Sequence, residues 1–388
     1  MLPFALIFDL REIILFPEVI FLVRHRALVE FLEEIAPPHL ESDWDNSGTQ
    51  VSTGQENISK ILIDLDPSLE LIDKSVTREV DLVLTHHPLI FSQLDSLDQD
   101  TLTGKKIFTL VQNGTGLISI HTPFDQSERG LSQGLAERLD LHSTSPLTRL
   151  ETGKLFKLEV FVPRSEEDYL VEALTGAGAG KVGNYEDSYY RWKAEGRFKP
   201  LKSATPHQGR ENRSESTKEV RLDFLVEPSA KDQVISALRR SHPYEEPGFS
   251  LIKTERSEPG VGLGRIGRWK SARGIKEAKS FVAETLEVDE KEMTVSGTLS
   301  GPVNWVAASP GSGGSVVSPA DNSGVDLLIT GELDYHERLK TKEMGLTVIE
   351  VGHYHSEKVF TPWVGNLLRD RFTSDELQIE FHEEGTEI

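Results

Sequence analysis

The chain has 388 residues, of which 37% are hydrophobic and 27% are charged, so we expect two or three folded domains rather than a disordered polypeptide. The formal net charge of −21 argues against nucleic acid and anionic membranes as partners, because both are negatively charged. The absence of cysteine excludes disulfides, iron–sulfur clusters and thiolate zinc sites. Any metal ion must therefore be held by His, Asp, Glu, backbone or water. The lack of cysteine does not fix the compartment, but it is compatible with a reducing cytoplasm, where we expect the protein.

Residues 1–27 are predicted to form an N-terminal extension. A membrane span needs ~20 mostly apolar residues with few charges. A signal peptide would show a basic start and an uninterrupted apolar run. Residues 2–23 fit neither pattern, because charged side chains interrupt the apolar run at Asp9, Arg11, Glu12 and Glu18. We expect an additional strand or helix, or residues that follow a start codon placed too early, and not a membrane anchor.

Helical and strand patterns alternate along residues 28–150, the predicted first half of a metal-binding domain. Short apolar runs bounded by polar residues are typical of buried strands, and strands that alternate with helices indicate βαβ units and a largely parallel sheet. The predicted helices are 27–35 and 67–76, and the predicted strands are 61–65, 81–84 and 117–120.

Residues 151–269 have a different pattern, with a glycine-rich turn at 176–183 and a polar, loop-like stretch at 202–218. Two successive β-α-β arrangements are typical of a ferredoxin-like domain, so we predict that an α+β domain is inserted here. The predicted strands are 154–162, 220–226 and 248–253, and the predicted helices are 166–174 and 230–239.

The first pattern returns in residues 270–388, the predicted second half of the metal-binding domain. Residues 80–85 match residues 325–330 almost one for one, and a Gly-Leu strand follows in each half, at Gly116 and Gly345. We therefore predict an α/β fold in which two related half-units form one domain; the alternative is chance similarity between two buried strands. In this half the predicted helices are 275–285 and 357–368, and the predicted strands are 303–307, 326–329 and 346–351.

Six of the twelve histidines lie in four short clusters, and each cluster follows a predicted strand. In open α/β sheets, ligands bind beyond the carboxyl ends of the strands, so the four clusters are expected to converge. Imidazole and carboxylate are the usual ligands of zinc, iron or manganese when thiolate is absent. The sequence therefore predicts a metal site built from segments 85–88, 121–125, 330–336 and 352–357.

The spacing within these clusters suits metal binding. His353 and Glu357 are four residues apart, as are His121 and Asp125, which places each pair on one face of a helix.

Adjacent residues of a strand point in opposite directions, so His86 and His87 could each hold one ion of a pair. Glu357 or Asp125 could bridge the two ions, and two metals ~3.5–4 Å apart are a recurrent hydrolytic arrangement.

Several neighbouring residues have roles that the sequence leaves open. His121 and His355 could orient ligands instead of binding the metal. His336 could be a ligand, a general acid or base, or a plain surface residue, and Glu332 is a second candidate acid or base. Asp66 either accepts a hydrogen bond from a ligand histidine or caps a helix.

Two further segments also allow two interpretations. Trp44 is either a buried residue of a turn or a wall of the pocket. The Gly- and Ser-rich segment 309–314 either cradles an anion through its backbone N–H groups or forms a flexible loop.

These motifs resemble those of the NIF-three-like dinuclear-metal-centre proteins, also called GTP cyclohydrolase I type 2 homologues. The resemblance covers about residues 28–370 and includes Trp44-Asp45-Asn46 and the histidine clusters, in the family's order. It implies a toroidal homohexamer whose sites face an inner cavity. It also implies two divalent metal ions per chain, held by His86, His87, Asp125, His353 and Glu357.

The middle region is similar to the CutA- or PII-like insertion of the longer bacterial members of that family. The similarity rests on segments 176–180, 183–185, 196–200, 242–246 and 262–265. From its residues alone, the run from His242 to Glu246 indicates a turn with a possible second site, or an interface. The chain departs from the family pattern at Pro123, where Asn is usual, and at Thr49, where Leu is usual.

Three functions are compatible with these features. The first is a metal-dependent hydrolase that acts on a nucleotide-like or phosphate-containing small molecule, with His336 and Glu332 as candidate catalytic residues. The second is a non-catalytic regulator that binds a metal or a metabolite. The third is a scaffold for protein partners, for which the sequence offers no clear apolar patch. An open coordination position beside a pocket would favour the first.

Overall fold

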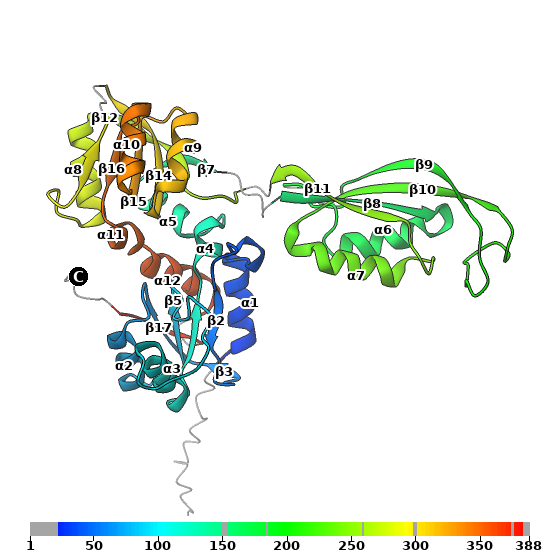
Figure 1. Cartoon of the computed structure of the whole chain (residues 1–388), viewed down its shortest axis with the longest axis horizontal. Helices are drawn as coiled ribbons and strands as arrows, with labels where there is room; N and C mark the ends of the chain where they lie inside the picture. Colours follow the sequence, from blue (N-terminus) through cyan, green and yellow to red (C-terminus); the bar gives the residue numbers. More distant parts are fainter. Residues whose placement is uncertain are drawn as a thin grey trace, which may run out of the picture.

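The computed structural model describes residues 22–148, 154–183, 185–257, 260–297, 301–373 and 376–382. Two larger sheets lie one above the other and form one unit, and a third sheet forms a second unit that projects to one side (Figure 1). The predicted mixed α/β class is thereby confirmed. Within the described ranges, no helix is long and apolar enough to cross a bilayer. The segment 1–21, for which we predicted an extra element and no anchor, lies outside these ranges.

The first large sheet has five strands in the order β17-β4-β5-β6-β2, of which β17, β4, β5 and β6 are parallel. Its apolar residues alternate between two layers, because successive side chains of a strand point to opposite faces. Ile61 and Ile63 face the central core with helix α1, whereas Leu62 packs with α2 and α3 on the other face. The bounds are α1 (His25–Ile35), β2 (Gly48–Val51), β4 (Lys60–Asp64), α2 (Leu69–Thr77), β5 (Leu82–Thr85), α3 (Leu102–Gln112), β6 (Gly116–Ser119) and β17 (Gln378–Phe381).

The second large sheet has six strands in the order β13-β16-β15-β14-β12-β7, of which β14, β15 and β16 are parallel. Leu327 and Ile329 face the same central core, together with α8, and Leu328 packs against α9 on the opposite face. The bounds are β7 (His142–Pro146), β12 (Arg265–Arg273), α8 (Ile275–Leu286), β13 (Thr294–Ser296), β14 (Val303–Ser312), α9 (Val317–Asn322), β15 (Leu327–Glu332), α10 (Tyr335–Met344) and β16 (Val348–Glu350).

The two large sheets share one topology. In the first, β2 is antiparallel to β6, and β5 and β4 follow in parallel; in the second, β13 is antiparallel to β16, and β15 and β14 follow in parallel. Strands β5 and β15, which carry the matching segments of the internal repeat, occupy equivalent positions. Each half then adds a short helix and a longer one: α4 (Thr122–Gln126) and α5 (Leu131–Arg138), and α11 (His353–Glu357) and α12 (Phe360–Arg371).

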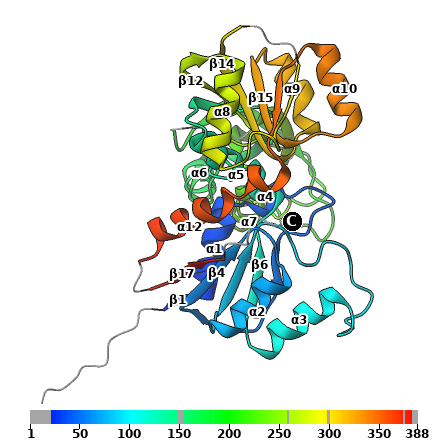
Figure 2. The ribbon, with the colours of Figure 1, turned by 90° about the vertical axis from the view of Figure 1, so that its left-hand side faces the viewer.

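These additional helices cross over between the halves. Helix α5 of the first half contacts β12 and β14, whereas α12 of the second half contacts β4 and β17. Strand β7 likewise joins the second sheet and β17 joins the first. Trp363 of α12 fixes the crossing by donating its indole N–H to the carbonyl of Arg129, 2.8 Å away. The helices lie between the sheets (Figure 2), so one apolar core spans both halves.

The projecting unit is an antiparallel sheet in the order β11-β8-β10-β9 with helices α6 and α7 packed against its core. Strand β9 was missed by sequence reasoning, because it is an edge strand whose side chains are mostly exposed and show no apolar alternation. The bounds are β8 (Lys154–Pro163), α6 (Glu167–Gly176), β9 (Tyr189–Phe198), β10 (Glu215–Val226), α7 (Lys231–Ser241) and β11 (Phe249–Ser257).

The remaining elements lie close to the expected boundaries. The predicted polar stretch 202–218 is shorter than expected, because β10 already begins at Glu215. The expected boundary after residue 269 falls within β12, which belongs to the second large sheet, and the expected boundary after residue 27 falls within α1. A short β1 (Val23–Arg24) pairs with β3 (Asn57–Ile58).

Candidate metal centre

The first pair of site residues follows β5 directly. The backbone N–H groups of His86 and His87 both donate to the carbonyl of Leu65, which fixes the turn after the strand. His86 is fully buried, and its Nδ1 lies 2.9 Å from the carbonyl of Ile120. Nδ1 of His87 lies 2.8 Å from Oδ1 of Asp66. The structure therefore decides between the two roles considered for Asp66: it binds the ligand histidine, and Ser68 caps helix α2.

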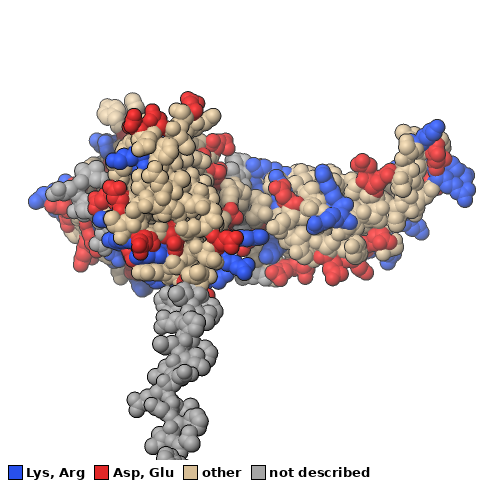
Figure 3. Space-filling model, turned by 90° about the horizontal axis from the view of Figure 1, so that it is seen from below, with Lys and Arg blue, Asp and Glu red and all other residues tan. Residues whose placement is uncertain are grey.

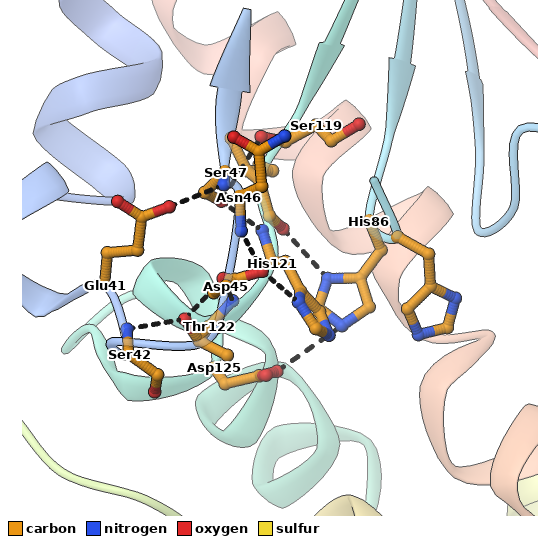
Figure 4. Close-up of polar contacts among 12 residues, drawn as sticks. Glu41, Ser42, Asp45, Asn46, Ser47, His86, Ser119, His121, Thr122 and Asp125 are labelled. Carbon is orange, nitrogen blue, oxygen red and sulfur yellow. Dashed lines mark hydrogen bonds and ion pairs between the residues drawn. The ribbon is translucent and has the colours of Figure 1, made fainter. Parts of the chain in front are cut away.

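The second pair, His121 and Asp125, lies at the start of α4, where Pro123 suits the first turn of a helix. Nδ1 of His121 is 2.7 Å from Oδ1 of Asp45, and Thr122 donates both its backbone N–H and its hydroxyl to Oδ2 of Asp45 (Figure 4). Burial alone would raise the pKa of Asp45, but these hydrogen bonds lower it to about 2. Asp45 is therefore an ionised anchor for the His121 imidazole.

The third pair, His353 and Glu357, forms the two ends of the short helix α11, which precedes the crossing helix α12. The predicted one-helix-face geometry is confirmed, since Nε2 of His353 lies 3.2 Å from Oε2 of Glu357. Nδ1 of His353 lies 3.0 Å from Oε1 of Glu332. Gly311 of β14 comes so close that a Cβ there would lie 2.3 Å from Oε1 of Glu357.

The three pairs converge into two overlapping groups: His86, His87 and His121 offer ligand atoms that all lie within 4.8 Å of one another, and so do His87, His353 and Glu357. His87 belongs to both groups, and its Nε2 is 3.3 Å from Oε2 of Glu357. These groups could hold metal ions. Nε2 of His86 is 3.5 Å from Oδ1 of Asp125, which adds a second carboxylate to the cluster.

All four imidazoles are held in the same way. Each Nδ1 faces a carbonyl or carboxylate oxygen, namely Ile120 O, Asp66 Oδ1, Asp45 Oδ1 and Glu332 Oε1. These oxygens can only accept, so each Nδ1 carries a proton and each Nε2 is the ring nitrogen turned toward the cluster. Histidines that bind metals are oriented in this manner.

Three buried polar atoms at the centre lack a well-aligned hydrogen bond within the described part of the chain and face other cluster atoms 3.2–3.5 Å away: Nε2 of His86, Oδ1 of Asp125 and Oε2 of Glu357. Burying polar or charged atoms without a partner is costly, and a cation between them would remove the cost. Burial raises the pKa of Asp125 well above its usual value, and the nearby Glu357 carboxylate adds to this rise. The donor set thus fits divalent ions, whose charge would relieve the repulsion between two carboxylates.

The imidazoles differ in charge before a metal binds. Burial lowers the pKa of His86 to about 3, so this side chain is neutral. Burial would also lower the pKa of His87, but the hydrogen bond to Asp66 and the close contact with the Glu357 carboxylate outweigh burial and raise it to about 10. The close contact with the Glu357 carboxylate raises the pKa of His353 to about 9.

The other candidate residues differ in how closely they approach the cluster. His121 is within reach of a metal, so the geometry adds it to the five expected ligands. Glu332 contacts the cluster only through His353. His336 is exposed on α10 beside Tyr335, and His355 lies near Glu292; among the described residues, no hydrogen bond or ion pair joins either histidine to the cluster.

Segment 309–314 is neither of the two structures considered for it. Strand β14 continues to Ser312, so most of the segment is regular strand and not a flexible loop. The N–H of Gly311 donates to Oγ of Ser356, and the N–H of Gly313 donates to the carbonyl of Glu332. These two donors are therefore engaged within the protein. The segment forms one side of the cluster through the close approach of Gly311 to Glu357.

An aromatic pair stands beside the cluster. The rings of Trp44 and Phe91 lie 5.9 Å apart, and Trp44 is 5.7 Å from the ring of His121. Trp44 is 59% exposed and Phe91 is 54% exposed, so both rings can contact a ligand. The side-chain amide of Asn46 donates to the carbonyl of Ile90 and connects the two segments. Of the two roles considered for Trp44, the structure supports a wall of the site.

The fold and the cluster together define a class: an α/β protein of two topologically similar halves, with histidine and carboxylate groups that could hold metal at their junction. A family model described as Duf34/NIF3 (NGG1p interacting factor 3) matches residues 23–387. The chain therefore belongs to the Duf34/NIF3 family. This agrees with the resemblance inferred from the motifs.

Relatives of known name match over most of the chain. The Bacillus subtilis protein named GTP cyclohydrolase 1 type 2 homolog is 33% identical over 346 residues, which is 89% of this chain and 92% of that protein. A protein of the same name from Halalkalibacterium halodurans is 30% identical over 350 residues, covering 89% and 93% of the two chains. A crystal structure of a Bacillus cereus protein related to NIF3 superimposes with a TM-score of 0.77 at 28% identity, covering 94% of this chain and 98% of that one.

Proposed function

We propose that each chain binds two divalent metal ions through His86, His87, Asp125, His353 and Glu357. The observation that carries the proposal is the convergence of buried atoms without a well-aligned hydrogen bond from His86, Asp125 and Glu357. Two further features support a pair of ions instead of one. His87 is shared by two groups of candidate ligands, and the two carboxylates approach from opposite halves of the chain. His121 is an additional candidate ligand. Zinc, iron and manganese all suit this donor set.

We propose further that the protein is a metal-dependent hydrolase. Bound divalent ions would supply Lewis-acid catalysis and a positive charge that attracts an anionic substrate. Asp66, Asp45 and Glu332 would act as positioning residues, because each holds the Nδ1 of one imidazole and leaves its Nε2 for the metal. His336 stays a prediction as general acid or base.

The substrate class follows from the wall of the site. Exposed Trp44 and Phe91 offer two aromatic faces next to His121, which suits stacking of a planar heterocycle. A nucleotide-like molecule combines such a ring with phosphate, which the cations would attract. The cyclohydrolase names of the relatives are compatible with a nucleotide-like substrate, although those names describe the relatives.

A second candidate function is non-catalytic binding of a metal or a metabolite by a regulatory protein. The observation that favours it is the projecting unit, whose strand order β11-β8-β10-β9 is compatible with the ferredoxin-like domain expected from the sequence. An open coordination position that turns over a substrate would support the hydrolase. Full metal loading without turnover of any tested substrate would support the regulator.

We also carry over the assembly and location implied by the family: a homohexamer in the cytoplasm, with a small molecule and no nucleic acid as its ligand. The net charge of −21 supports the exclusion of nucleic acid. On the face seen in Figure 3, acidic and basic side chains are mixed and form no continuous basic surface. Sedimentation velocity of the full chain would test the hexamer.

Metal content per chain tests the metal site directly. The protein is purified without chelator or histidine tag, equilibrated with zinc, iron(II) or manganese, desalted and assayed by plasma mass spectrometry. We expect about two ions per chain, and a fall in both His87→Ala and Glu357→Ala. His336→Ala is the matched control, because this histidine is exposed and outside the cluster. Unchanged metal in the two cluster variants, or no metal in the wild type, would refute the proposed site.

The hydrolase is tested separately on metal-loaded protein. Nucleotides and phosphate esters are screened for release of phosphate or ring-opened product. Any substrate that is found is then tested with Trp44→Leu, in which the aromatic face is lost while the metal ligands remain. We expect a higher KM and an unchanged metal content. An unchanged KM would contradict stacking on Trp44, and a fall in metal content would mean that Trp44 supports the cluster itself.

A further inference from the structure

The projecting unit contains a cavity of about 650 Å³ that the metal centre does not use. The chain enters and leaves the unit near Lys154 and Ser257, and the cavity lies at the opposite end of the unit. It is lined by β9, the loop after β9, β10 and the loop between α7 and β11. Figure 1 shows this end of the unit pointing away from the two large sheets. The volume falls within the range of small-molecule sites.

A buried carboxylate lies in this cavity. Glu219 of β10 is only 9% exposed. Its Oε1 accepts a hydrogen bond of 2.7 Å from the hydroxyl of Tyr244, and its Oε2 lies beside the backbone of Gly196. Space next to Oε2 is kept by Gly196, because a Cβ at that position would lie 2.6 Å from this oxygen. The Oε2 of Glu219 can therefore accept hydrogen bonds from a ligand in the cavity.

The loop that carries Tyr244 is held rigidly. Nε2 of His242 donates to the carbonyl of Phe161, and its Nδ1 accepts the backbone N–H of Tyr244. The side chain of Glu245 accepts the N–H of Thr205, which ties the loop after β9 to the same wall. The segment 242–246, for which the sequence suggested a turn with a possible second site, thus builds one side of the cavity.

The remaining walls indicate what kind of molecule would fit. Phe161, Phe198, Leu201 and Pro206 supply an apolar surface. Besides His207 and Tyr244, two basic and four acidic side chains line the cavity, a formal balance of 2 − 4 = −2 that disfavours anions: Arg197, Lys199, Glu195, Glu219, Glu245 and Glu246. A neutral or cationic ligand with N–H donors and an apolar body satisfies both the Oε2 of Glu219 and the apolar walls.

We propose that this cavity binds a small molecule whose planar amidine- or guanidine-type group pairs with Glu219 while an apolar ring or chain lies against Phe161 and Phe198. A planar N–C–N edge suits the carboxylate, because Oε2 can accept from a ligand and Oε1 keeps a lone pair beside its bond from Tyr244. Nothing in this site depends on the metal cluster, so the proposed ligand cavity and the proposed metal site can be tested independently.

Benzamidine and benzoate provide a matched pair of probes, because they share a phenyl ring and carry opposite charges. Binding to the full-length protein is measured by saturation-transfer NMR and by calorimetric titration. We expect benzamidine to bind and benzoate not to bind. This comparison uses wild-type protein and does not depend on the folding of a variant. Equal binding of both probes, or no binding of benzamidine, would overturn the proposal.

Glu219→Gln then locates the probe. The substitution keeps the shape and the acceptor for Tyr244 but removes the charge, so we expect benzamidine to bind about tenfold more weakly, the loss expected for one charge-assisted hydrogen bond. Glu172→Gln is the matched control, because Glu172 is exposed on α6 outside the cavity. Gly196→Ala should also weaken binding by closing the space beside Oε2. Undiminished benzamidine binding in Glu219→Gln would show that the probe lies elsewhere and that the proposal is wrong.

Discussion

Replacing Gly311 by alanine tests the metal centre from outside its set of ligands. A Cβ at residue 311 would lie 2.3 Å from Oε1 of Glu357 and 3.5 Å from Nε2 of His353. Ordinary van der Waals contact begins at 3.4 Å, so the Glu357 carboxylate would have to retreat by about 1 Å (3.4 − 2.3). Metal sites tolerate errors of only about 0.2 Å in ligand distance. We therefore expect Gly311→Ala to lose metal affinity by about tenfold or more, the lower end of the loss seen when a supporting group of a metal site is removed.

A second glycine separates this steric effect from the cost of backbone strain. Gly311 has φ +64, and Gly324, between α9 and β15, has φ +66. Alanine in this left-handed region costs roughly 1–2 kcal/mol at either position. A Cβ at residue 324, however, would meet nothing within 4 Å. Gly324→Ala should therefore lose a similar amount of stability and keep its metal.

The assay is competitive titration of zinc against a chromogenic chelator, with thermal unfolding of the metal-free proteins measured in parallel. The expected pattern is similar destabilisation of the two variants with loss of affinity in Gly311→Ala alone. If Gly311→Ala binds zinc as tightly as the wild type, then the Glu357 carboxylate is not a metal ligand, and the reasoning fails.

Three further predictions follow from the contacts of the cluster. Asp45→Asn should lower metal affinity about 10–100-fold by releasing His121, measured by the same titration, with exposed Asp43→Asn as control. The pKa of His87 is raised to about 10 and that of His353 to about 9, so both are protonated at pH 7 without metal. Metal binding should therefore release about one to two protons and weaken as the pH falls. Calorimetry in buffers of different ionisation enthalpy would detect the released protons, and a binding heat that does not depend on the buffer would contradict the prediction. Phe360→Ala should lower the free energy of unfolding by roughly 3–5 kcal/mol, because this fully buried ring packs on His86 and Phe124. In denaturant titrations Phe360→Leu should lower the free energy of unfolding much less, and equal losses in the two variants would refute the packing argument.

The large sheets could be predicted because their strands are fully buried. Ile61 to Ile63 and Leu327 to Ile329 are apolar on both faces, as parallel strands between helical layers must be, and their continuous runs are visible in the sequence. Strand β9 could not be found in this way. Its outer face is open to solvent, so Tyr190 and Trp192 are exposed and no alternation distinguishes the strand from a loop.

The residue types of the candidate site could be predicted from the sequence, but the residues that orient them could not. The spacing of His353 and Glu357 on one helical turn is a local property, and local geometry can be derived from sequence. The partner of each Nδ1 is not local: Asp45 reaches His121 across 76 positions of the chain, and only the fold brings them together. The same holds for Gly311, whose role depends on the approach of β14 to α11. Asp66 and Ser68 show the opposite case. Ser68 caps helix α2 and Asp66 contacts His87, but the two residues are only two positions apart, so the sequence cannot tell which of them is the cap.

The crossing of helices explains why the centre needs both halves. His86, His87, His121 and Asp125 come from the first half, whereas His353 and Glu357 come from the second. The helix that follows Glu357, α12, packs on β4 and β17 of the first sheet, and the helix that follows Asp125, α5, packs on β12 and β14 of the second. Each half therefore positions its proposed ligands by anchoring the next helix in the core of the other half. A movement of the two sheets relative to each other would change the distance from His87 to Glu357, now 3.3 Å, before it disturbed either ligand pair within its own half. Metal bound at this junction would connect the halves, so metal loading should raise the unfolding temperature of the wild type and have much less effect on Glu357→Ala.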